Sequence, residues 1–130
     1  MKDVDAISAD VVDEAIRIHR ELGPGLLESV YEMVLAGALA RRGYMVERQK
    51  PINVHFDGMT FKDAFKIDIL VEASLVIELK SVEKLNGAHA KQLLTYLRLL
   101  KQPLGLLLNF SGEIMKDGIR RMVNNHRPTH

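Results

Sequence analysis

The sequence predicts a single α/β domain. Its 130 residues suit one hydrophobic core, because a chain of this size can bury about two thirds of its unfolded surface. Apolar residues recur with helical spacing before Gly43, alternate with polar residues after it, and return to helical spacing from Asn86. No internal repeat and no long linker divides the chain. We therefore expect one domain over residues 1–130, with loose tails at residues 1–7 and 125–130.

Composition excludes several classes of protein. Hydrophobic residues make up 47% of the chain and charged residues 27%, which is typical of soluble globular proteins rather than disordered or fibrous ones. No apolar stretch approaches the about 20 residues of a membrane helix, and the first residues lack the basic and apolar blocks of a secretion signal. We therefore expect a cytoplasmic protein. The chain has no cysteine and its histidines lack the spacing of zinc motifs, so a bound metal needs oxygen or imidazole ligands and zinc is not expected.

The charge distribution is uneven, although the net charge is only +1. Residues 80–101 carry five basic side chains and one acidic one, and a second basic cluster consists of Arg41, Arg42, Arg48 and Lys50. Such clusters suit a polyanionic partner, but a solvated helix face with scattered lysines gives the same pattern.

Two helices are predicted before Gly43. The first covers about residues 9–22, with Ser8 as its N-cap, and ends at the glycine-proline-glycine sequence of residues 23–25. The second covers about residues 26–42, and Gly43 can end it in a left-handed conformation. The apolar residues expected to face inward from this second helix are Leu27, Val30, Val34, Leu35 and Ala38.

The rest of the chain is predicted to supply the sheet and two further helices. The expected strands cover residues 52–56 and 60–61, joined by a turn at Asp57-Gly58, and residues 65–71, 75–80 and 104–110. The last of these strands is apolar on both faces, which predicts a central position in the sheet. A third helix is expected over about residues 86–100, with leucines on its buried face, and a closing helix over residues 114–124.

The predicted hairpin of residues 65–80 has a register that can be calculated. If Val71 and Leu75 close a three-residue loop, Asp68 lies directly opposite Glu78 on one face of the sheet. The apolar pairs on the other face are then Ile69 with Ile77 and Ile67 with Leu79. A bulge could alter this register. A two-residue loop would pair Asp68 with Leu79 instead, but it would place apolar residues opposite charged ones.

Two facing carboxylates predict a metal site. Cross-strand neighbours stand about 5 Å apart at their Cβ atoms, where like charges destabilise a sheet unless a positive charge lies between them. Asp68 and Glu78 would suit Mg²⁺ or Mn²⁺, which prefer carboxylate, carbonyl and water oxygens. Lys80, on the same face, can orient or help to deprotonate an attacking water. Two carboxylates that bind a metal ion, together with this lysine, suit metal-assisted phosphodiester hydrolysis. The alternative is a salt-bridged cluster of these three side chains on a half-exposed sheet.

Four segments resemble motifs of a known group of proteins. Asp68, followed after nine residues by Glu78, Leu79 and Lys80, resembles the active-site signature of the PD-(D/E)XK nuclease superfamily. The other similar segments are residues 25–31 (GLLESVY), which match the motif of the GxxExxY protein family within it, residues 92–96, which resemble a QxxxY element, and residues 105–110, which resemble the terminal core strand. The resemblance covers about residues 12–124. It implies an αβββαβ core, in which helices flank a mixed sheet.

The resemblance also implies a role for the residues of the hairpin. It makes Asp68 and Glu78 ligands of a metal ion, with the main-chain carbonyl of Leu79 as a further ligand. Lys80 would be the catalytic lysine. The implied cofactor is Mg²⁺ or Mn²⁺, in agreement with the oxygen ligands that the sequence offers.

Residues of two predicted helices complete the implied site. Glu28 matches an acidic residue that reaches the metal directly or through water, and Gln92 would lie beside the metal or the scissile phosphate. Tyr31 and Tyr96 are expected to act as supports. Without the resemblance, Glu28 and Tyr31 would be an ordinary exposed acid and a partly buried aromatic residue, and Gln92 and Tyr96 a hydrogen-bonding pair at a helix edge.

The predicted function is therefore that of a nuclease. The resemblance implies a metal-dependent enzyme that hydrolyses phosphodiester bonds, in DNA rather than RNA because most of the superfamily acts on DNA. The basic clusters would steer the polyanion, with an affinity that falls steeply with salt. The alternatives are an inactive nuclease-fold module that binds nucleic acid or a protein partner, and an interaction protein whose polar cluster merely orders the sheet. Because cutting two strands takes two sites, a homodimer is a further expectation.

Overall fold

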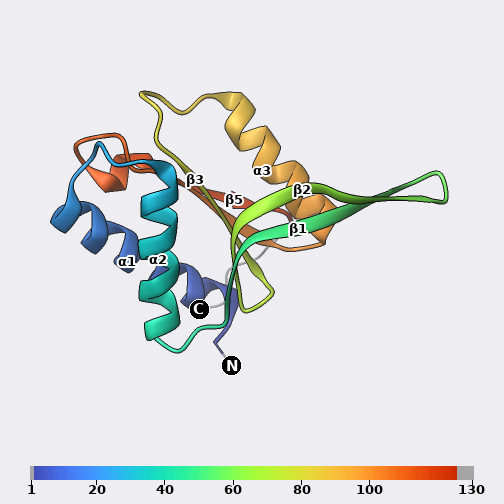
Figure 1. Cartoon of the computed structure of the whole chain (residues 1–130), viewed down its shortest axis with the longest axis horizontal. Coiled ribbons are helices and arrows are strands. Elements are labelled where there is room, and N and C mark those ends of the chain that lie inside the picture. The colour runs from blue at the N-terminus through green and yellow to red at the C-terminus, as the bar shows by residue number, and fades with distance from the viewer. Residues whose placement is uncertain (1, 126–130) are drawn as a thin grey trace.

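A mixed sheet of five strands forms the centre of the protein (Figure 1). The structure is a computed structural model and describes residues 2–125. The strands are β1 (Val46–Phe56), β2 (Met59–Val71), β3 (Leu75–Lys80), β4 (Leu104–Asn109) and β5 (Ile119–Val123), and they lie in this order across the sheet. β3 and β4 run parallel, whereas the other neighbouring pairs are antiparallel. The predicted α/β fold with a mixed sheet is confirmed, and β4 is a buried inner strand as expected.

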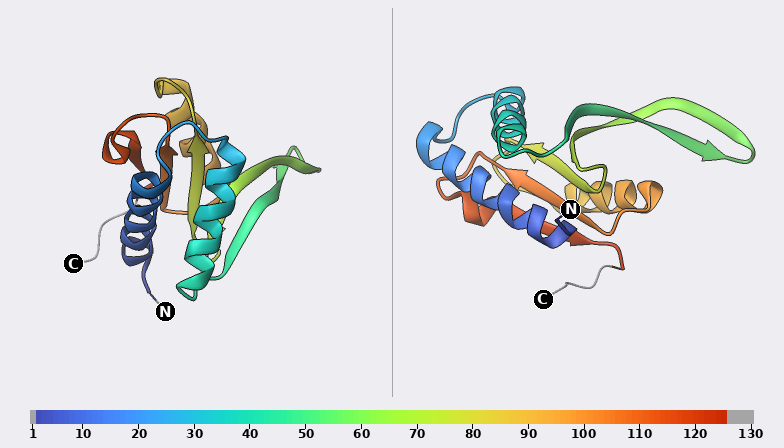
Figure 2. Two further views of the ribbon diagram at one scale, coloured as in Figure 1. Left: turned by 60° about the vertical axis from the view of Figure 1, so that its left-hand side comes forward. Right: turned by 90° about the horizontal axis from the view of Figure 1, so that it is seen from below.

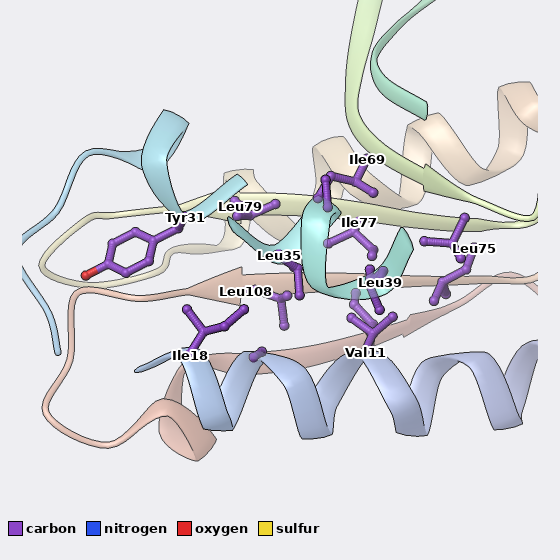
Figure 3. Close-up of a cluster of buried hydrophobic side chains, with 14 of the residues drawn as sticks. Val11, Ile18, Tyr31, Leu35, Leu39, Ile69, Leu75, Ile77, Leu79 and Leu108 are labelled. Carbon is purple, nitrogen blue, oxygen red and sulfur yellow. The ribbon is translucent and has the colours of Figure 1, made fainter. Parts of the chain in front are cut away.

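Helices cover both faces of this sheet (Figure 2). The helices are α1 (Val4–Leu22), α2 (Glu28–Arg41) and α3 (Gly87–Leu100), and a short 3-10 helix, η1 (Met115–Gly118), precedes β5. α1 and α2 pack on one face through a large apolar cluster, which includes Val11 of α1, Leu35 of α2 and Ile77 of β3 (Figure 3). α3 packs on the opposite face through Leu93 and Leu97. Within residues 2–125, none of the helices is both long and apolar enough to cross a membrane.

The first helix begins earlier than predicted. It starts at Val4 rather than at residue 9, and its N-cap is Asp3, whose side chain accepts a hydrogen bond from the Ala6 N–H (2.8 Å). Ile7 and Ser8 are buried, so the expected cap at Ser8 is wrong and residues 4–7 are not a loose tail. The helix extends because Ile7 continues the apolar stripe of Val11 by one turn. Of the other expected tail, residues 126–130 lie outside the described residues.

The second helix buries only part of the predicted face: Leu35 is fully buried, and Val34 and Ala38 pack against the same core while partly exposed. Leu27 precedes the helix and is 72% exposed, whereas the fully buried positions include Tyr31, Leu35 and Leu39, which are four residues apart. The Tyr31 hydroxyl donates to the Gly23 carbonyl and accepts from the Leu26 N–H, which ties α2 to the loop after α1, and the Tyr31 ring stacks on Phe110. The helix ends at Arg41, and Gly43 takes a positive φ of 99° as the sequence predicted.

The predicted closing helix is absent, because residues 114–124 form η1 and then β5. The pattern of Ile114, Met115, Ile119 and Met122 suits a helix, but it also suits a strand. β4 is buried along its whole length, and its outer edge needs hydrogen-bonding partners. β5 supplies them through an antiparallel register that pairs Leu106 with Arg121.

Gly118 is required by a close approach between η1 and β4. An added Cβ would lie 2.2 Å from the Asn109 carbonyl oxygen, a contact that only a backbone shift can relieve. We expect Gly118→Ala to lower the free energy of unfolding by about 1–3 kcal/mol, as overpacking usually does. Urea denaturation measures this. The control is Gly37→Ala in α2, which has open space around it and should stabilise the helix by about 0.5–1 kcal/mol. Equal effects of the two substitutions would contradict the prediction.

β1 and β2 form a long arm that leaves the body of the protein (Figure 1). Their turn is Asp57-Gly58, as predicted, and both residues have a positive φ. β2 joins the two separately predicted strands into one element of 13 residues. The base of the arm lies beside β3, and the site described below is located there.

Candidate metal centre

The predicted register of β2 and β3 is confirmed where the two strands pair. Val71 lies opposite Leu75 and Ile69 lies opposite Ile77, as a three-residue loop requires. The backbone pairing of β2 with β3 ends at Ile69 and Ile77. Beyond this point, side chains of one strand bind the backbone of the other. Asp68 Oδ2 accepts a hydrogen bond from the Leu79 N–H (2.9 Å).

The two predicted acids meet directly beyond the end of the ladder. Glu78 Oε1 accepts a hydrogen bond from the main-chain N–H of Asp68 (3.2 Å), so each carboxylate binds the backbone of the opposite strand. The two carboxylates therefore lie close together at the end of the ladder, where the charge of Asp68 acts on Glu78. The two acids therefore meet as predicted, but the observed backbone register ends at Ile69 and Ile77 and does not itself pair Asp68 with Glu78.

One apolar pair of the prediction is wrong. Ile67 was expected opposite Leu79, but it packs with Leu93 and Leu97 under α3, whereas Leu79 belongs to the cluster under α1 and α2. The alternation of β2 is interrupted at Asp68, where the backbone ladder with β3 ends. Ile67 therefore lies on the opposite face of the sheet from Ile69.

The environment of Glu78 disfavours its charged form. The residue is only 6% exposed, and burial raises the pKa of its carboxyl from 4.5 to about 8. The adjacent charge of Asp68 acts in the same direction, while the hydrogen bond from the Asp68 N–H and the charge of Lys80 lower the pKa. Lys80 is therefore close enough to act on Glu78 electrostatically, and negative charge in this pair is only partly compensated.

Lys80 is fixed at the end of β3 by its neighbours. Its carbonyl accepts a hydrogen bond from the Phe110 N–H (3.0 Å), and it pairs with Asn109 in the parallel ladder. The buried Asn109 side chain also bonds both the N–H and the carbonyl of Val82 (3.1 and 2.9 Å). Hydrogen bonds to β4 and its following residue therefore hold the backbone at Lys80 and at Val82.

Glu28 reaches the same strand end from α2. Its Oε1 accepts a hydrogen bond from the N–H of Ser81, which directly follows Lys80 (3.1 Å). Within residues 2–125, however, no three Asp, Glu or His side chains form a group that could hold one ion. Glu28 is therefore held at the end of β3, and its expected contact with the metal, directly or through water, stays a prediction.

Two residues of α3 differ in how closely they approach the pair. Tyr96 stacks on Phe65 of β2, with ring centroids 4.2 Å apart, and burial raises the pKa of its hydroxyl, as do the charges of Glu78 and Asp68. Tyr96 therefore lies near both acids. Gln92, one turn earlier, is exposed, and its side chain makes no hydrogen bond within the described part of the chain. Its predicted role is not tested by this geometry.

A hydrogen-bonded chain of three further residues, which the sequence analysis did not assign to the site, leads to Asp68. These residues are Gln49, Glu32 and Arg48. Gln49 of β1 donates from Nε2 to Asp68 Oδ1 (3.2 Å) and to Glu32 Oε1 (2.6 Å). Glu32 is 6% exposed, and its other oxygen lies 3.0 Å from Nη2 of Arg48. The only sequence signal was the position of Glu32 four residues after Glu28 on one helix face. Nothing in the sequence pointed to Gln49.

The donor set fits a hard divalent cation. Asp68 and Glu78 offer carboxylate oxygens, and the main chain between Glu78 and Lys80 offers the Leu79 carbonyl. Mg²⁺ is usually bound by one or two carboxylates with several waters, and Mn²⁺ accepts the same ligands. A buried carboxylate beside a second one is also costly without a compensating positive charge, which such an ion would supply.

Two comparisons with known proteins found a match for the chain. A family model described as the PD-(D/E)XK nuclease superfamily matches residues 5–122. Among solved structures, the crystal structure of SSO0001 is similar at 19% sequence identity and a TM-score of 0.48, over 92% of this chain and 66% of that one. The chain thus spans just under two thirds of that protein's length. No curated protein matches the chain.

Proposed function

The chain belongs to the PD-(D/E)XK nuclease superfamily, and from this premise we propose that it is a nuclease that uses Mg²⁺ or Mn²⁺ to hydrolyse phosphodiester bonds in DNA. The observation that carries the proposal is the reciprocal bonding of Asp68 and Glu78, with Lys80 beside them. Membership of the GxxExxY family is part of the proposal, and the GLLESVY sequence of residues 25–31 supports it.

Each residue of the site has a distinct task in this proposal. Asp68, Glu78 and the Leu79 carbonyl hold the cation. When bound, the cation polarises the phosphate and makes water a stronger nucleophile at neutral pH. Lys80 orients the attacking water and places positive charge beside the phosphate as its negative charge grows.

Two further side chains take part from the helices. Glu28 is proposed to reach the cation through water, and its bond to the Ser81 N–H supports this because it holds the acid at the end of β3. Gln92 is proposed to contact the scissile phosphate. Its position one turn before Tyr96 on α3 supports this role, since Tyr96 lies near both acids.

The charges on the surface favour one of the two basic clusters as the nucleic-acid contact. In the cluster of residues 41–50, Arg42 pairs with Asp10 and Glu14, and Arg48 and Lys50 are also ion-paired. In residues 80–101, by contrast, none of the five basic side chains forms an ion pair within the described chain. We therefore assign the phosphate contacts to this second segment, and cutting both strands of a duplex would take a homodimer with two sites.

Binding of Mn²⁺ is expected to stabilise the folded protein. An ion that binds only the folded state at a concentration of 100 times its Kd adds about 2.7 kcal/mol to the free energy of unfolding. A thermal melt with and without Mn²⁺ measures the shift, which Asp68→Asn should abolish. The matched control is Asp57→Asn at the tip of the arm, which should keep the wild-type shift. If Mn²⁺ raises the melting temperature of the Asp68 variant as much as that of wild type, the assignment of Asp68 as a metal ligand is wrong.

A further inference from the structure

The side-chain amide of Gln49 joins two carboxylates from different layers of the fold. Its Nε2 donates to Asp68 Oδ1 at 3.2 Å and to Glu32 Oε1 at 2.6 Å. An amide nitrogen carries two hydrogens, so it can donate both bonds at once. Because Asp68 Oδ2 accepts from the Leu79 N–H, both oxygens of Asp68 have a fixed donor.

The orientation of this amide follows from its partners. Ionised carboxylates only accept hydrogen bonds, so Glu32 and Asp68 both require the nitrogen of Gln49 rather than its oxygen. Glu32 is itself held in place by its surroundings, since it is buried in α2 and bound by Nε and Nη2 of Arg48 (3.1 and 3.0 Å). The buried Glu32 therefore anchors Gln49, and Gln49 in turn holds Asp68.

The backbone of Gln49 is unusual for a strand. Its φ is +49°, in the left-handed region that non-glycine residues rarely occupy. The residue lies between Arg48 and Lys50, which pair with Ile69 and Ile67 of β2. The strained position is thus opposite Asp68, where the ladder between β2 and β3 also ends.

We propose that Gln49 is a positioning residue that holds the Asp68 carboxylate in the orientation required for binding the metal ion, with Glu32 and Arg48 as its anchor. This inference rests on the proposed function, because it assumes that Asp68 is a metal ligand. A ligand held by an outer hydrogen bond loses little freedom on binding, and loss of such a partner typically weakens metal affinity by about 10- to 100-fold. Gln49 itself contributes no ligand to the ion.

The test is calorimetric titration of Mn²⁺ into wild type and two variants of Gln49. Gln49→Met removes the donor at similar length, and Gln49→Gly removes it while relieving the positive φ. Both variants are expected to raise the Kd for Mn²⁺ by about 10-fold or more. At saturating Mn²⁺ their cleavage rate should return towards that of wild type, and the KM for DNA should stay unchanged.

Controls separate positioning from general destabilisation. Gln102 also donates from Nε2 to a carbonyl, that of Ala73, in a turn away from the acids (3.2 Å), so Gln102→Met should leave the Kd for Mn²⁺ unchanged. A thermal melt of the metal-free proteins shows whether each variant is folded, and glycine at position 49 favours the observed backbone. Wild-type affinity in both Gln49 variants would overturn the inference and leave the proposed function intact. Failure of the wild type to bind Mn²⁺ would overturn both.

Discussion

Replacing Lys80 with alanine is expected to lower the rate of phosphodiester cleavage by about 10²- to 10⁴-fold, the usual contribution of a positioned proton-transfer group. The loss corresponds to about 3–5 kcal/mol of transition-state stabilisation. Affinity for Mn²⁺ should change little, because Lys80 supplies no metal ligand. The measurement compares cleavage of single-stranded, duplex and branched DNA by the two proteins at saturating Mn²⁺.

Two other substitutions define what the lysine does. Lys80→Arg keeps the positive charge but cannot give up a proton near neutral pH, so partial activity in this variant would assign an electrostatic role. Lys116→Ala, on the exposed surface of η1, serves as the control and should cleave like wild type. Equal cleavage by wild type and Lys80→Ala would place the activity elsewhere. Mn²⁺ binding without any cleavage would favour the alternative of an inactive nucleic-acid-binding module.

The acidic pair could be predicted because strand geometry is simple. Side chains alternate along a strand, and a three-residue loop between Val71 and Leu75 leaves only one register for Asp68 and Glu78. The observed pairing of Ile69 with Ile77 follows the same arithmetic. α3 was similarly predictable, because its leucines recur with helical spacing and Asn86 caps it through its side chain.

The parts that could not be predicted depend on contacts between distant residues. Gln49 of β1 binds Asp68 of β2 from a position with a positive φ, which no local pattern of the sequence signals. Ile67 changes face where the ladder between β2 and β3 ends. The strand β5 replaces a helix of suitable periodicity because β4 requires a partner at its edge. In each case tertiary hydrogen bonding overrides local preference.

Glu78 should make the stability of the metal-free protein fall as the pH rises. Its pKa is about 8 in the folded protein and near 4.5 when unfolded, so between these values the folded state holds a proton that the unfolded state releases. The free energy of unfolding therefore decreases from about pH 4.5 to pH 8, by on the order of 4 kcal/mol if the whole shift is expressed. Urea denaturation with a chelator present, from pH 5 to pH 8.5, measures this slope.

Replacing Glu78 with a neutral residue should remove this dependence of the free energy of unfolding on pH. Glu78→Gln is expected to be more stable than wild type at pH 8 and close to it at pH 5, whereas Glu113→Gln, at an exposed position, should keep the wild-type profile. Added Mn²⁺ should reverse the trend in wild type, because a cation favours the ionised carboxylate and competes with its proton. The stabilisation by Mn²⁺ should therefore grow towards pH 8 in wild type and vanish in Glu78→Gln. A Mn²⁺ effect of equal size at pH 5 and pH 8 would mean that the ion does not bind the Glu78 carboxylate.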